Sequence, residues 1–216
     1  MIDTIFPKVH KEGHKFLAIA AAITFILFLI SNFLGLISLV LTIWIFYFFR
    51  DPERFPINDE NYLVSPADGI ISQIMEVNGP KELGLQDKKF TKVSIFMNVF
   101  NCHVNRVPFS GKITQIFYKP GKFLNASLDK ASEDNERNYV KIKNTNGEEL
   151  VLVQIAGLIA RRIVCEIKEN EEIKQGNSFG MIRFGSKVDL YFENYSLMVK
   201  QNQKTIAGET IIAKKR

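Results

Sequence analysis

The chain has 216 residues, a net charge of +5 and a sequence pI near 9.1. This length accommodates one soluble domain and a small additional segment. The lysines are scattered, with no dense basic run and no aromatic-interleaved motif, so nucleic acid is not expected as a partner, whereas the positive surplus suits anionic lipid.

The first predicted element is the apolar segment from Phe16 to Phe49, which contains no charged residue. It is longer than the apolar core of a cleaved signal peptide, about 7 to 15 residues, and is therefore predicted to be membrane-embedded. One straight helix of this length would overshoot a hydrocarbon core of about 30 Å at 1.5 Å per residue. A break is therefore expected at Ser31-Asn32 and Gly35.

Two topologies fit this segment, a helical hairpin and a single tilted span with interfacial ends. Basic residues flank both ends, and positive charge marks the cytoplasmic side of a membrane. They are Lys8, Lys11 and Lys15 on one side and Arg50 and Arg54 on the other. A hairpin places both flanks on the same side and is favoured. Residues 1–50 are thus expected to anchor the chain in the cell membrane, with residues 51–216 forming a domain on its cytoplasmic side.

The remainder of the chain is predicted to be mainly β. Runs rich in β-branched and aromatic residues alternate with turn residues, and no segment keeps a long 3.6-residue period. Strands are expected at 63–65, 70–74, 92–97, 111–118, 139–143, 149–155 and 187–192. Asn146-Gly147 predicts a hairpin turn between two of them. Short helical pieces are expected only around 98–101 and 158–163.

Disulfide and metal chemistry are not expected in this chain. The two cysteines, Cys102 and Cys165, have no paired spacing and are predicted to be reduced, buried thiols. His103 is the only histidine outside the N-terminal segment. A zinc site of the metallopeptidase kind needs several histidines and a carboxylate, so no metal is predicted.

The dipeptide Gly185-Ser186 lies between two strand-like segments near the C-terminus. Glycine allows strained backbone conformations and leaves its carbonyl open to attack, and a serine hydroxyl is a potential nucleophile. Such a junction can rearrange to an ester and then break by β-elimination. The new N-terminal residue can lose ammonia and become a pyruvoyl group, a carbonyl that acts as an electron sink.

Four segments together resemble the short form of the phosphatidylserine decarboxylase proenzymes. They are Ser65–Gly69, Met97–Pro108, Asn125–Asn138 and Gly180–Ser186. The resemblance extends in order from Phe49 to the C-terminus. It implies self-cleavage between 185 and 186, and decarboxylation of phosphatidylserine to phosphatidylethanolamine through a Schiff base on the pyruvoyl group. The two fragments, 1–185 and 186–216, would remain together as a heterodimer.

The resemblance also implies roles for individual residues. Ser186 would be the cleavage nucleophile and the source of the pyruvoyl cofactor, and Gly185 would contribute the carbonyl that is cut. Asp68 would belong to a relay that activates the serine. His103 would act as base in cleavage or as proton donor after decarboxylation. Where long-form relatives have a second histidine this chain has Arg106, so a complete Asp-His-Ser triad is not carried over.

Arg106 is instead a candidate substrate-binding residue, because a guanidinium group binds phosphate or carboxylate in bidentate fashion. A structural salt bridge is the alternative reading of this arginine. The sequence leaves both readings open.

A second resemblance concerns the fold. Lys174–Ile182 is similar to the turn-and-strand unit of barrel-sandwich hybrid folds, as in lipoyl carriers, so a domain of that kind is expected. Asp129-Lys130-Ala131 copies the lipoyl-acceptor tripeptide, but its flanking residues fit the decarboxylases better. The remaining functional alternative is an uncleaved relative that binds a lipid or a partner, which would stay a single chain.

Overall fold

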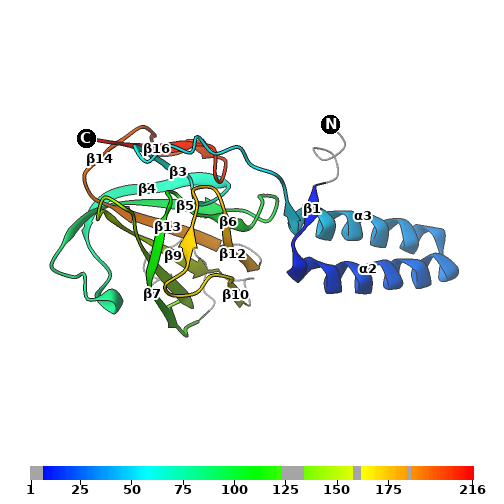
Figure 1. The fold of residues 1–216 in the computed structure, drawn as a ribbon. Coiled ribbons are helices and arrows are strands. Elements are labelled where there is room, and N and C mark those ends of the chain that lie inside the picture. Colours follow the sequence, from blue (N-terminus) through cyan, green and yellow to red (C-terminus); the bar gives the residue numbers. More distant parts are fainter. Residues whose placement is uncertain (1–6, 123–133, 158–161, 184–185) are drawn as a thin grey trace. The chain divides into compact units, whose positions relative to one another are not determined.

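The computed structural model describes residues 7–122, 134–157, 162–183 and 186–216. The chain divides into two compact units, residues 1–53 and residues 54–216. Figure 1 shows a pair of helices in the first unit and strands in the second. The fold is mainly β, as predicted.

The first unit contains the helices α2 (Lys11–Ile30) and α3 (Asn32–Phe48), separated by the extended residue Ser31. The predicted break thus falls at Ser31. With 20 residues, α2 is long and apolar enough to cross a membrane, while α3 is a shorter apolar helix. The strands β1 (Lys8–Val9) and β2 (Arg50–Asp51) pair with each other and bring both flanks of the helix pair together.

Small and polar residues lie where α2 and α3 pack. Thr24 Oγ1 is 2.8 Å from Ser38 Oγ and 2.9 Å from Thr42 Oγ1. A Cβ added at Gly35 would lie 2.3 Å from the Phe28 ring, so only glycine permits this approach. Leucine, isoleucine and phenylalanine side chains cover the outward surface of both helices.

The second unit is built on an eight-stranded antiparallel sheet that curls into a half-barrel. Its strands, in spatial order, are β11 (Glu172–Ile173), β7 (Gly111–Lys119), β8 (Arg137–Lys143), β9 (Glu149–Ala156), β13 (Ser186–Phe192), β5 (Lys89–Met97), β4 (Gly69–Asn78) and β15 (Lys204–Thr205). A 3₁₀ turn, η1 (Lys81–Leu83), lies between β4 and β5.

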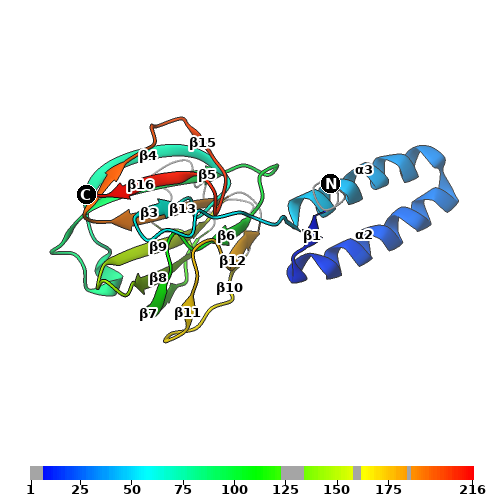
Figure 2. The ribbon, with the colours of Figure 1, turned by 45° about the horizontal axis from the view of Figure 1, so that its top comes forward.

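Two three-stranded sheets accompany the large one, as Figures 1 and 2 show from two directions. One contains β10 (Arg162–Cys165), β12 (Ser178–Arg183) and β6 (Val104–Arg106), and the other β14 (Tyr195–Leu197), β16 (Ile211–Lys215) and β3 (Tyr62–Val64). Side chains from all three sheets form one hydrophobic core.

The strand β13 is buried on both of its faces. Val188 and Leu190 point into the core shared with the small sheets, whereas Tyr191 belongs to a second cluster with Val153 and Ile155. This alternation follows from the two-residue period of a strand. The face that carries Tyr191 also holds the buried Lys187 and Asp189, whose Nζ and Oδ1 atoms lie 4.0 Å apart.

The seven strands predicted from the sequence are all present, and Gly147, with a φ of 81°, forms the predicted turn between β8 and β9. The predicted helical pieces are wrong where they can be compared. Residues 98–101 form a turn, closed by the Asn101 N–H to the Asn98 carbonyl at 3.0 Å. Residues 162–165 form β10 because they pair with β12, and residues 158–161 lie outside the described residues.

Candidate active site

The predicted cleavage junction lies where the chain crosses from a small sheet to the large one. The strand β12 ends at Arg183, and β13 begins at Ser186. Gly185 and its predecessor lie outside the described residues. Ser186 is therefore the first residue of an interior strand of the eight-stranded sheet.

A second connection crosses beside this junction. The strand β5 ends at Met97, opposite Ser186, and β6 begins at Val104, opposite Met181. The connection 98–103 thus joins the same two sheets on one side of the junction. The carbonyl of His103 accepts the Ile182 N–H at 3.4 Å. The structure therefore brings His103 and Ser186 to the same crossing.

On the other side of the junction, β9 ends at Ala156, opposite Ser186, and β10 begins at Arg162, opposite Arg183. The Ala156 carbonyl accepts a hydrogen bond from Asn135 Nδ2 at 2.8 Å. Strands thus flank Ser186 on both sides. The two ladders therefore hold the backbone at Ser186 in place.

The Ser186 side chain is fully buried. The strand period places it on the same face as Val188, toward the shared core, and its ladder neighbours Met97 and Ala156 belong to that core. Among the described residues, Ser186 Oγ makes no hydrogen bond. A buried hydroxyl without a partner costs free energy, and such an atom in a native fold calls for a functional explanation.

His103 is also fully buried, and its ring has a defined orientation. Its Nδ1 lies 3.0 Å from the carbonyl oxygen of Asn101. A carbonyl only accepts hydrogen bonds, so Nδ1 must carry the hydrogen, and Nε2 keeps the lone pair in the neutral ring. The ring is thus held in the tautomer that can act as a base through Nε2.

The connection that carries His103 is shaped by its asparagines. The Asn98 N–H donates to Asn101 Oδ1 at 2.9 Å, and the Phe100 N–H donates to Asn98 Oδ1 at 2.9 Å. Such side-chain to backbone bonds stabilise turns in place of regular structure. They position Asn101, whose carbonyl orients the histidine.

Asp68 immediately precedes β4, at the same end of the large sheet. The ladder runs from Ile70 through Phe96 to Lys187, so Gly69 lies two strands away from β13. Both carboxylate oxygens of Asp68 accept from Arg54 Nη2, at 3.0 and 2.8 Å, and Oδ1 also accepts the Ala207 N–H at 2.8 Å. The carboxylate is therefore paired with an arginine that the sequence suggested only as a membrane flank.

Arg106 lies at the end of β6, opposite Ser178. Its Nη1 donates to the Gly176 carbonyl at 3.0 Å, and its main-chain N–H donates to the Pro66 carbonyl at 2.9 Å. A Cβ added at Gly208 would lie 3.1 Å from Arg106 Cδ and 3.4 Å from Arg54 Cβ. Both arginines therefore lie close to Gly208, and Arg54 also pairs with Asp68.

A buried chain of amides leads to the junction and was not predicted from the sequence. Asn138 Nδ2 donates to Gln154 Oε1 at 3.0 Å, Gln154 Nε2 donates to Asn105 Oδ1 at 2.9 Å, and Asn105 Nδ2 is 3.6 Å from Met97 Sδ. Gln154 interrupts the apolar run of β9, and a buried polar residue requires partners. That interruption is the signal by which it could have been found.

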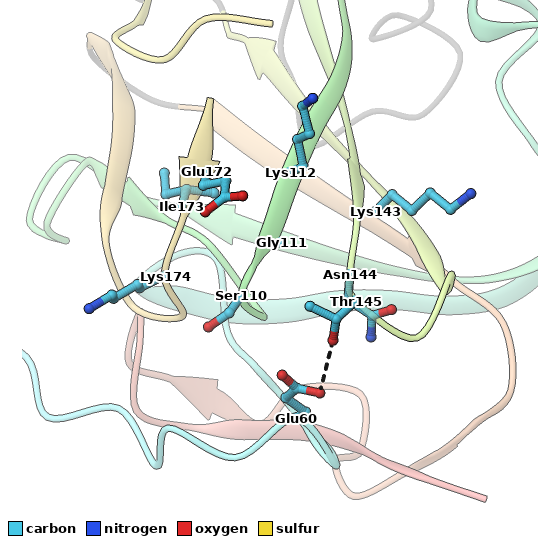
Figure 3. Close-up of a pocket in the computed structure, with 10 residues that line it drawn as sticks. All are labelled: Glu60, Ser110, Gly111, Lys112, Lys143, Asn144, Thr145, Glu172, Ile173 and Lys174. Atoms are coloured by element: carbon cyan, nitrogen blue, oxygen red, sulfur yellow. Dashed lines mark hydrogen bonds between the residues drawn. The ribbon is translucent and has the colours of Figure 1, made fainter. Parts of the chain in front are cut away.

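One surface pocket lies away from the junction. Its volume is about 430 Å³, and it is lined by residues such as Gly111, Lys143 and Ile173. The pocket lies at the Lys143 end of β8. The other end of this strand, at Arg137, pairs with Ile155 near the junction. Figure 3 shows the side chains of Lys112, Lys143 and Lys174 pointing in different directions, so they do not converge on one ligand.

The described residues contain no group of three or more histidine, cysteine or acidic side chains that could hold a metal ion. Both cysteines are free thiols; Cys102 is buried and Cys165 is partly buried. Burial raises the pKa of the Cys165 thiol, which disfavours the reactive thiolate.

The chain is similar to known proteins over nearly its whole length. The family model for phosphatidylserine decarboxylase matches residues 41–213. The chain is 69% identical over 215 residues to a phosphatidylserine decarboxylase proenzyme of Pelagibacter ubique, covering 100% of both chains. It is 54% identical over 214 residues to that of Ruegeria pomeroyi, covering 99% of this chain and 98% of the relative. With that of Rickettsia typhi the identity is 52% over 213 residues, covering 98% and 92%. The chain therefore belongs to the phosphatidylserine decarboxylase family, which confirms the resemblance seen in its sequence.

Proposed function

We propose that this chain is a proenzyme that cuts itself between Gly185 and Ser186 and then decarboxylates phosphatidylserine to phosphatidylethanolamine. Membership of the decarboxylase family supports the reaction, and the proenzyme names of the relatives support the processing. The observation that carries the proposal is Ser186 itself. Its buried Oγ lacks a hydrogen-bond partner among the described residues and begins an interior strand next to the connection that bears His103.

In the cleavage step, Ser186 Oγ attacks the carbonyl carbon of Gly185 and gives up its proton. We assign that proton to Nε2 of His103, the nitrogen with the lone pair in the neutral ring. The C–N bond breaks as the C–O bond forms, and an ester replaces the peptide. β-Elimination then breaks the Cβ–Oγ bond, releases Gly185 as a carboxylate at the end of the larger fragment and leaves dehydroalanine at residue 186. Its imine tautomer is hydrolysed by one water molecule, which supplies the keto oxygen of the pyruvoyl group as ammonia leaves.

The residues present fit a pyruvoyl group at position 186. The core neighbours Met97 and Ala156 are apolar and keep bulk water away from residue 186, and the ladders on both sides hold its backbone in place. The pyruvoyl carbonyl supplies an electron sink for the electrons left when carbon dioxide departs. His103 is the proposed donor of the proton that replaces carbon dioxide on the substrate carbon.

Asp68 and Arg106 are proposed to support this centre. Asp68 pairs with Arg54 and would place a fixed negative charge at this end of the large sheet. Through that charge it would act on the cleavage step. Arg106 is a candidate contact for a substrate anion, since its guanidinium has the donor geometry for phosphate or carboxylate.

We further propose that residues 1–50 form a transmembrane helical hairpin and that residues 51–216 form a barrel-sandwich-hybrid-like domain on the cytoplasmic side of the cell membrane. The pairing of β1 with β2 supports the hairpin, because it joins the two flanks that a single span would separate. Fragments 1–185 and 186–216 would stay together, because β13 lies between β9 and β5 along its whole length.

Substitution of the nucleophile tests the proposal. Ser186→Ala should yield one full-length chain without decarboxylase activity, whereas Ser186→Cys should still cleave, more slowly, through a thioester. Detection of both fragments in the alanine variant would show that another residue makes the cut. A wild-type protein that stays whole and binds lipid would instead identify an uncleaved binding relative.

A further inference from the structure

Asn105 and His103 point the same way from the small sheet that meets the cleavage junction. Asn105 belongs to β6, and His103 directly precedes this strand, where its carbonyl accepts the Ile182 N–H at 3.4 Å. Side chains two residues apart in an extended segment project from the same face. The Asn105 amide reaches Gln154 of β9, so both side chains point toward the large sheet.

The Asn105 amide crosses over β13 beside Ser186. Its Nδ2 lies 3.6 Å from Met97 Sδ, and its Oδ1 accepts from Gln154 Nε2 at 2.9 Å. Met97 pairs with Ser186 on one side of β13. Gln154 pairs with Val188 on the other side. The line that joins the two contacts therefore passes over β13 between Ser186 and Val188.

A step of two residues leads from this contact to the proposed reacting groups. Along β13, the step from Val188 to Ser186 runs toward the junction. Along β6, the step from Asn105 to His103 runs toward the same crossing, because His103 ends the connection that begins after β5. The contact between Asn105 and Gln154 therefore sets how far along the large sheet His103 lies.

The contact is buried and is supported by a third amide. Asn105 and Gln154 are fully buried, and Asn138 of β8 is 2% exposed. Asn138 Nδ2 donates to Gln154 Oε1 at 3.0 Å, so both polar atoms of the Gln154 side chain are held. Hydrogen bonds are directional, whereas apolar side chains in their place would pack without fixing a register.

We propose that Asn105 and Gln154 are positioning residues for self-cleavage, which hold His103 within reach of Ser186. The inference rests on the proposed function, in which Ser186 attacks and His103 takes its proton. Proton transfer requires the two groups to lie within hydrogen-bond reach, and a displacement of about 1 Å can cost about 10²-fold in rate. Both amides act through His103 and not on the reacting atoms.

The test replaces the Gln154 amide by an apolar side chain of the same length, in Gln154→Met. Newly made full-length chain is produced in a short pulse of cell-free synthesis, and fragment formation is then followed on gels. We expect fragments to form about 10- to 100-fold more slowly than in the wild type.

Asn144→Leu is the matched control. Asn144 is a buried amide just beyond the opposite end of β8, where its Nδ2 donates to Glu148 at 2.8 Å. Its replacement should lower the urea midpoint of unfolding, as the Gln154 variant does, but leave the rate of fragment formation at the wild-type value. Equal rates in Gln154→Met and Asn144→Leu would overturn the proposal.

A double-mutant cycle with His103→Ala separates positioning from general destabilisation. In the His103→Ala background, where fragments form slowly, Gln154→Met should change the rate by less than about twofold, because the residue that it positions is gone. Effects that multiply would show that Gln154 acts through stability or on Ser186 itself, and the proposal would fail.

A triple variant, Asn105→Leu, Asn138→Leu and Gln154→Met, removes all three amides together. It leaves no amide of this chain unpaired, so its urea midpoint should return toward the wild-type value, whereas fragment formation should stay at least about tenfold slower. Wild-type cleavage in this variant would overturn the proposal. The triple variant takes the place of Gln154→Met in the cycle if the single variant does not fold.

Failure of the proposed function gives a different result. The wild type would then stay whole, or Ser186→Ala would still yield both fragments. A wild type that cleaves, together with a Gln154→Met variant that cleaves equally fast, would contradict the positioning role alone.

Discussion

At the scale of single residues, we expect His103 to matter more for decarboxylation than for self-cleavage. Self-cleavage occurs once per molecule, so a weaker base can complete it over hours, whereas decarboxylation repeats and reveals any lost proton transfer. General acid–base groups contribute about 10²- to 10⁴-fold. His103→Ala should therefore lower turnover per cleaved molecule by at least the smaller of these factors, while fragments still accumulate at a reduced rate.

A gel assay of cleavage combined with lipid turnover separates the two steps. His14→Ala is the matched control, because His14 is an exposed residue of α2 outside the second unit. It should behave as the wild type in both assays. Normal turnover per cleaved molecule in His103→Ala would limit His103 to maturation or structure.

Asp68 should show the opposite pattern. Asp68→Asn keeps the size of the side chain and an oxygen for the Ala207 N–H, but it removes the charge that pairs with Arg54. We expect fragment formation to slow more than turnover per cleaved molecule. Arg54→Gln should slow cleavage in the same way if the ion pair is what matters. An Asp68→Asn variant that cleaves at the wild-type rate would remove Asp68 from the maturation machinery.

At the scale of elements, the β8–β9 turn is tied to the C-terminal strands by one carboxylate. Glu148 accepts from Tyr195 Oη at 2.9 Å and Asn144 Nδ2 at 2.8 Å, and it pairs with Lys215 Nζ at 2.9 Å. Burial alone would raise the pKa of Glu148, but these partners together hold it below its usual value.

A lowered pKa means that the folded state favours the ionised carboxylate, so this contribution is present above the unfolded pKa and is lost as the pH falls through the folded value. Glu148→Gln should therefore reduce the free energy of unfolding at neutral pH by about 1–3 kcal/mol. The difference from the wild type should shrink below about pH 4. Urea unfolding at several pH values measures this, and a difference independent of pH would refute the assignment.

The strands were predictable because their residues follow the two-residue period or form apolar runs bounded by turns. Their order, with β13 between β9 and β5, depends on pairings between distant segments that no local pattern records. Turn 98–101 was misjudged as helical because asparagine side chains bond to the backbone there. Residues 162–165 form a strand because they pair with β12, and this pairing overrides the helical preference that was expected for residues 158–163.

The candidate site was predictable to a similar extent. Ser186 and His103 were predicted through the family resemblance, and both lie where two connections pass between the same two sheets. The Arg54–Asp68 pair could not be foreseen from the sequence. Arg54 precedes β3 and Asp68 follows it, so only the folded chain brings the two side chains together.

At the scale of the whole molecule, the two compact units predict a division of labour. Removal of residues 1–49 should leave a soluble domain that still cleaves itself, because Ser186 and His103 both belong to the second unit. The truncated protein should decarboxylate bilayer-embedded lipid poorly but short-chain substrate in micelles well. A folded truncation that remains uncleaved would show that the helix pair takes part in maturation.

Intact-mass measurement of the purified wild-type protein tests the central claim most directly. The account predicts two chains, one ending at Gly185 and one beginning at residue 186, with residue 186 lacking its amino nitrogen. A single full-length species of 24.7 kDa, or a smaller fragment that begins with an unmodified serine, would contradict it.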